Sequence, residues 1–115
     1  MSPRRWQDRL RDIVAAVEEI LAFAEGMDLK AFAADAKTQK AVLADIALIG
    51  EAARHVPVRI AEAHPEIPWR DMQDMRNFVV HAYFSVEPAI VWDTVTHDLP
   101  KLAQALRALI EDEGE

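Results

Sequence analysis

Apolar residues recur at steps of three and four along most of the chain, which is the period of an amphipathic α-helix. The clearest stripe, within residues 3–25, consists of Trp6, Leu10, Ile13, Val17, Ile20, Leu21 and Ala24. Pro3 is tolerated in the first turn of such a helix, and Gly26 ends it. Asp28 can cap a brief helix over residues 28–35. The first third of the chain therefore predicts one long helix and one short one.

The same period predicts a second long helix from about Thr38 to His55, with Gly50 inside it. A glycine in a helix interior costs about 1 kcal/mol relative to alanine, so we interpret Gly50 as a point of close contact with another helix. Pro57 interrupts the pattern, and residues 58–63 can form one or two turns. The prolines of residues 64–68 require an extended connection, because a residue before proline avoids the helical region.

A third long helix is predicted to begin at Trp69, with a buried stripe of Met72, Met75, Val79 and Ala82. Residues 85–88 mark a boundary, after which helical spacing resumes as far as Ile110. The sequence Asp98-Leu-Pro100 indicates a break or kink. Neither the alternation typical of strands nor a hairpin signal is present. We therefore expect an all-α fold, an up-and-down bundle of four to five helices in a single domain over residues 1–115.

Composition narrows the class of protein further. Hydrophobic residues make up 51% and charged residues 29% of the 115 residues, which excludes a disordered chain. With no cysteine, disulfide frameworks, thiolate nucleophiles and zinc fingers are excluded. No apolar run approaches the roughly 20 residues of a membrane span, and no secretory signal is visible. A cytoplasmic protein without a membrane partner is expected.

The formal net charge of −7 disfavours general nucleic-acid binding, because attraction to phosphate supplies most non-specific affinity. The charge is unevenly distributed, since the first eleven residues hold Arg4, Arg5, Arg9 and Arg11 against the single carboxylate of Asp8. Any nucleic acid must therefore bind in a local basic groove. A basic protein partner would suit the acidic remainder equally well.

Most common catalytic signatures are absent, including those of phosphate-binding loops, dinucleotide-binding turns, zinc proteases and serine hydrolases. Three of the four histidines, His55, His64 and His97, have no paired ligand three or four residues further on. We expect surface or capping roles for them and no metal site.

One segment, residues 75–84, places chemically capable side chains at an apolar helix end. Asn77 and His81 are one turn apart, while Arg76 and Tyr83 share a neighbouring face. Histidine can exchange a proton near pH 7, and arginine can hold a phosphate through two hydrogen bonds. These are the parts needed for RNA cleavage without a metal. The alternative is structural: Arg76 pairs with Asp71, Asp74 or an interface carboxylate, and His81 and Tyr83 only cap the helix.

The spacing Arg76-x4-His81-x-Tyr83 resembles the R-x4-H-x-Y motif of HepT-like toxins, a branch of the HEPN superfamily of small helical ribonucleases. Asp74 departs from the glycine usual in that family and places a carboxylate near Arg76, which is expected to oppose RNA binding. The segments that also resemble the family are residues 49–52, 64–70, 91–93 and 98–100.

The resemblance implies a homodimer whose two motifs meet across the interface and cut RNA without a metal or cofactor. Arg76 and His81 would be catalytic and Asn77 supporting. It further implies a type VII-like toxin–antitoxin pair, in which an MntA-type nucleotidyltransferase antitoxin, using its own ATP and Mg²⁺, transfers AMP to Tyr83.

Two questions remain open at this point. Glu51 lies mid-helix, where it either reaches the motif or pairs with Arg54 or His55. The competing function is a catalytically silent helical module that binds nucleotide or a nucleotidyltransferase partner.

Overall fold

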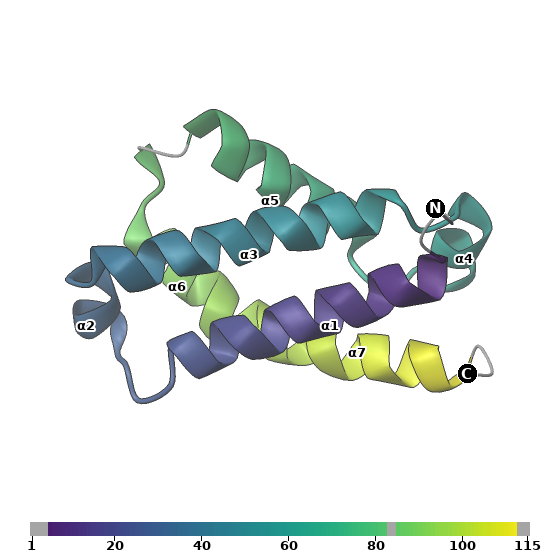
Figure 1. Ribbon diagram of the computed structural model, residues 1–115, viewed down its shortest axis with the longest axis horizontal. Helices are drawn as coiled ribbons and strands as arrows, with labels where there is room; N and C mark the ends of the chain where they lie inside the picture. Colours follow the sequence, from purple (N-terminus) through teal and green to yellow (C-terminus); the bar gives the residue numbers. More distant parts are fainter. Residues whose placement is uncertain (1–4, 83–84, 113–115) are drawn as a thin grey trace.

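Four long helices form most of the molecule. The computed structural model describes residues 5–82 and 85–112. The long helices are α1 (Trp6–Phe23), α3 (Ala36–Arg54), α5 (Trp69–Ala82) and α7 (Leu99–Asp112). Successive long helices run in opposite directions, and α3 contacts both α1 and α5 while α1 also contacts α7 (Figure 1). The spatial order is therefore α5, α3, α1, α7.

Short helices fill the connections between the long ones: α2 (Leu29–Ala33), α4 (Val58–Ala63) and α6 (Pro88–Asp93). Asp28 caps α2 as expected, because its carboxylate accepts a hydrogen bond of 2.8 Å from the backbone N–H of Ala31. Asp35 caps α3 by accepting from the backbone N–H of Thr38 at 3.0 Å. This bond is the main reason why the pKa of Asp35 lies below its ordinary value.

The expected break near Pro100 takes the form of a π-helical turn, η2 (Thr94–Asp98), between α6 and α7. Pro100 is then the second residue of α7, directly after the π-helical turn, and it has no N–H to donate to the preceding turn. Trp92 anchors α6 to α2, because its ring lies 5.1 Å from the ring of Phe32.

The core consists of the apolar stripes that face one another across the four long helices. On α1 the predicted residues Leu10, Ile13, Val17 and Ile20 are fully buried. On α5 only part of the predicted stripe is buried: Met72 and Val79 are, whereas Met75 and Ala82 are half-buried. Of the two half-buried residues, Met75 lines the cleft considered below.

The prediction of an all-α bundle is confirmed, since the described residues contain helices and no strand. The structure has four long helices, within the expected range of four to five, and its short helices α2 and α4 lie where the sequence predicts brief helical segments. No helix in the described ranges combines the length and apolar character needed to cross a membrane.

Candidate functional site

The crossing of α3 and α5 fixes the position of Arg76. Gly50 faces α5 there, and a Cβ added to it would lie 2.1 Å from the Cβ of Arg76 and 2.6 Å from the carbonyl oxygen of Met72. No side chain can occupy that space. Our interpretation of Gly50 as a close helix–helix contact is therefore confirmed, and the residue it contacts belongs to the predicted motif.

The guanidinium of Arg76 is held from two directions. Its Nε lies 3.7 Å from Oε2 of Glu51 on α3, and its Nη1 donates a hydrogen bond of 3.1 Å to Oδ1 of Asn77. The side chain is 31% exposed, so it is oriented and still reachable from solvent. Its remaining N–H donors bond to no other residue that the structure describes, and they are available to a phosphate.

Glu51 combines the two roles that the sequence left open. Besides Arg76, its carboxylate lies 3.4 Å from Nε2 of His55 and 3.6 Å from Nη1 of Arg54. One carboxylate thus faces two guanidinium groups and an imidazole. Within this group of four side chains two guanidinium charges face one carboxylate, which suits an anionic ligand.

His81 lies in the last turn of α5 and is exposed. It forms no hydrogen bond or ion pair within the described ranges, so its imidazole is accessible to a ligand. Asn77 binds the Arg76 guanidinium and has no recorded contact with this imidazole. Tyr83, the remaining residue of the motif, lies outside the described residues.

The aspartates near Arg76 in sequence point elsewhere. Asp74 Oδ2 lies 4.0 Å from Nε of Arg70, one turn earlier on α5, and Asp71 has no ion pair with any described residue. Within the described residues Arg76 pairs with Glu51 rather than with Asp71 or Asp74. Asp74 accordingly lies on the face of α5 that lines a different cleft.

A second cluster, which the sequence analysis missed, adjoins Glu51 between α1 and α3. Asp45 is only 8% exposed there, and it lines a cavity of about 490 Å³ together with Arg9, Glu19 and Glu51. Burial, followed by the neighbouring Glu19 carboxyl, raises the pKa of Asp45 to about 7. The signal was available, because Asp45 stands three residues after Val42 and thus within the apolar stripe of α3.

Neither cluster has the ligand arrangement of a metal centre. Across the described ranges, no group of three or more His, Asp or Glu side chains is placed to hold a metal ion. Through their own side chains, Arg76 can bind an anion and His81 can accept or donate a proton.

Comparison with known proteins places the chain in a family. The family model described as ribonuclease HepT-like matches residues 13–109. A protein of Thermococcus cleftensis named "Probable ribonuclease HepT" is 42% identical over 99 residues, covering 86% of this chain and 90% of its own. A protein of Methanocaldococcus jannaschii whose name also describes an RNase is 35% identical over 107 residues, covering 92% of this chain and 88% of its own. No solved structure gives a significant match. The chain thus belongs to the HepT-like ribonuclease family.

Proposed function

We propose that this protein is a metal-independent endoribonuclease and the toxin of a type VII-like toxin–antitoxin pair. The observation that carries the proposal is the Arg76 guanidinium, which Glu51 and Asn77 hold while other N–H groups stay available to a ligand. The exposed His81 follows five residues later on the same helix. The names of the two relatives described above, which are those of ribonucleases, support the same activity.

The proposed reaction uses the RNA's own 2′-hydroxyl as nucleophile. His81 accepts the hydroxyl proton as the oxygen attacks the adjacent phosphorus, and Arg76 stabilises the added negative charge of the pentavalent transition state. The bond to the 5′-oxygen breaks, and that oxygen takes a proton from a second, protonated imidazole. The products are a 2′,3′-cyclic phosphate and a 5′-hydroxyl. We assign the second imidazole to His81 of another copy, because a homodimer that joins two motifs supplies both protonation states.

Regulation is proposed to act through Tyr83, the only tyrosine of the chain and two residues beyond His81. An MntA-type nucleotidyltransferase, with its own ATP and Mg²⁺, would transfer AMP to the phenol. The new phosphodiester would bring a negative charge and considerable volume close to Arg76, where the RNA phosphate otherwise binds.

The test is RNA cleavage by the purified protein in excess EDTA. Wild-type protein should leave 2′,3′-cyclic phosphate ends, and His81→Ala or Arg76→Ala should lower the rate at least about 100-fold, in keeping with the contribution of a general acid or base. His97→Ala is the matched control, since His97 is exposed and its recorded polar contacts are with its near neighbours Asp93 and Thr96. Intact wild-type protein that binds RNA without cutting it would favour the silent module, and activity restored only by Mg²⁺ would refute the metal-independent mechanism.

A further inference from the structure

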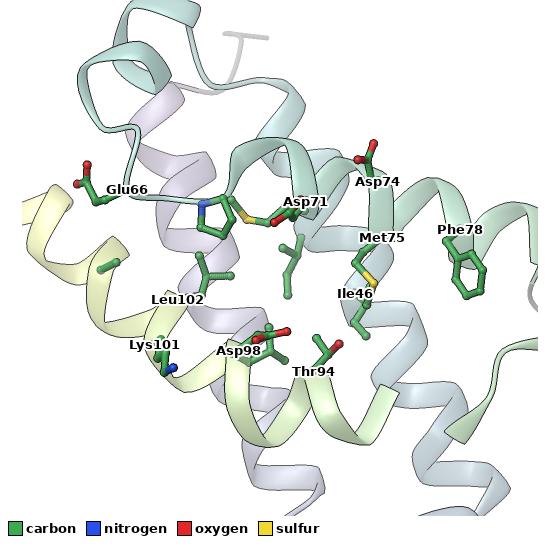
Figure 2. A pocket seen from close by; sticks show the side chains of 15 residues that line it. Ile46, Glu66, Asp71, Asp74, Met75, Phe78, Thr94, Asp98, Lys101 and Leu102 are labelled. Atoms are coloured by element: carbon green, nitrogen blue, oxygen red, sulfur yellow. The ribbon is translucent and has the colours of Figure 1, made fainter. Parts of the chain in front are cut away.

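We propose that a cleft between α5 and the η2–α7 segment binds a basic amphipathic helix of a partner protein. The cleft has a volume of about 770 Å³ and is seen from close by in Figure 2. It is lined from α5 by Met72, Met75 and Phe78, which are three residues apart and share one side of the helix. Arg76 and Asn77 are not among its lining residues, so this site is separate from the candidate catalytic site and does not depend on it.

The floor of the cleft is apolar. Ile46 and Ile49 of α3 and Leu102 of α7 form it, and all three are buried. At its edge Phe78 is 45% exposed, an unusual position for a phenylalanine in a small bundle. An amphipathic helix that inserts apolar side chains at steps of three and four would cover this surface.

Negative charge surrounds the apolar floor. Asp71 of α5 and Asp98 of η2 lie on facing sides of the cleft (Figure 2). Neither forms a hydrogen bond or ion pair with any residue in the described ranges. Glu66 and Asp74 also line the cleft, and among the lining residues that the structure describes Lys101 is the only basic one. Unpaired carboxylates on both walls match lysine or arginine on the two flanks of an apolar stripe, and they repel RNA and acidic surfaces.

The π-helical turn supplies an independent indication. Thr94 and Asp98, the first and last residues of η2, both line the cleft. A π-helical turn is rare and occurs frequently at functional sites. In this molecule the turn forms one wall of the cleft, so the irregular backbone and the unpaired carboxylate occur at the same place.

The test uses a fluorescent peptide of about 18 residues, with leucine at helical positions i, i+3, i+4 and i+7 and lysine at the flanking positions. Anisotropy should show saturable binding, weakened about tenfold by Asp71→Asn combined with Asp98→Asn. The control pair, Glu25→Gln with Glu62→Gln, removes the same charge at exposed positions outside the cleft and should change affinity less than twofold. Thr94→Trp, which fills the cleft without changing charge, should abolish binding.

Three results would overturn the proposal. The first is absence of binding to folded wild-type protein. The second is equal weakening by both charge pairs, or no effect of Thr94→Trp, since the peptide would then bind by general electrostatic attraction. The third is a dimer in sedimentation experiments that dissociates when Asp71 and Asp98 are replaced, since the occupant would then be a second copy of this chain.

Discussion

Gly50 and Arg76 meet at the crossing of α3 and α5 with no space for a side chain between them. This contact has two roles. It sets the spacing of two bundle helices, and it fixes the backbone of the residue proposed to bind phosphate. Stability and catalysis are therefore linked at this point.

Gly50→Ala is expected to lower both the stability of the protein and its rate of RNA cleavage. The added Cβ would lie 2.1 Å from the Cβ of Arg76, so α3 and α5 must separate. Overpacking of this kind costs roughly 1–3 kcal/mol, and the better helix propensity of alanine offsets about 1 kcal/mol of it. We expect a net loss of up to about 2 kcal/mol in urea denaturation, with RNA cleavage reduced about tenfold.

The control is Gly26→Ala. Gly26 has a positive φ of 79° and no atom within 4 Å of an added Cβ, so alanine strains the backbone there without moving Arg76. It should lower stability and leave cleavage per folded molecule unchanged. Equal losses of activity in the two variants would contradict the proposed link between the crossing and the site.

Glu51→Gln should change kcat more than KM. The amide keeps the size of the side chain and removes the charge that orients Arg76, so we expect kcat to fall about tenfold while RNA binding holds or strengthens. Stability should change by less than about 1 kcal/mol, because the ion pairs of Glu51 are partly exposed. Steady-state kinetics check this, with Glu18→Gln, whose carboxylate pairs with Arg107, as control. A rise in KM at constant kcat would show that Glu51 contacts RNA directly.

Asp45 predicts a pH dependence of stability. Its pKa is raised from 3.8 to about 7, so the folded protein holds a proton that the unfolded chain releases. The associated stability is complete below about pH 4 and is lost as the pH rises through 7. Asp45→Asn resembles the protonated form and should be more stable than wild type at pH 8 by about 1–3 kcal/mol, with little difference at pH 4. Parallel denaturation profiles across this range would contradict the assignment.

The helices were predictable because their apolar stripes are long and regular, as on α1. The motif was predictable from its spacing, but its geometry was not. Glu51 and Arg76 are 25 residues apart, and their ion pair depends on how closely two helices cross. The π-helical turn could not be predicted from the sequence either, since Pro100 indicates an irregularity in the helix without defining its form. Asp45 was overlooked because a single polar residue in an apolar stripe scarcely alters the helical period.

Dimerisation is expected at micromolar concentration. Leu48 on α3 is 46% exposed and Val80 on α5 is 50% exposed, and each lies within one turn of a candidate site residue, Glu51 and His81 respectively. An interface here would bring two motifs together. Sedimentation should show a dimer that Leu48→Glu dissociates with loss of cleavage, whereas Ile90→Glu, at an exposed position on α6, should have no effect. A fully active monomer would refute the two-copy mechanism.

Modification of Tyr83 is tested by co-expression with an MntA-type nucleotidyltransferase and measurement of intact mass. We expect an increase of one or more AMP units and loss of cleavage, both absent in Tyr83→Phe. Neutralised protein of unchanged mass would instead mean that the antitoxin inhibits by binding alone.

The two proposed catalytic side chains differ in how much freedom they retain before RNA arrives. Arg76 is already restrained by Gly50, Glu51 and Asn77, while His81 is exposed and unrestrained by the described residues. Immobilising a flexible side chain on binding costs about 0.5–1.5 kcal/mol. For Arg76 that conformational entropy is lost when the protein folds, so the free energy of its contact with phosphate contributes largely to affinity. His81 is the side chain that must lose conformational freedom when RNA binds.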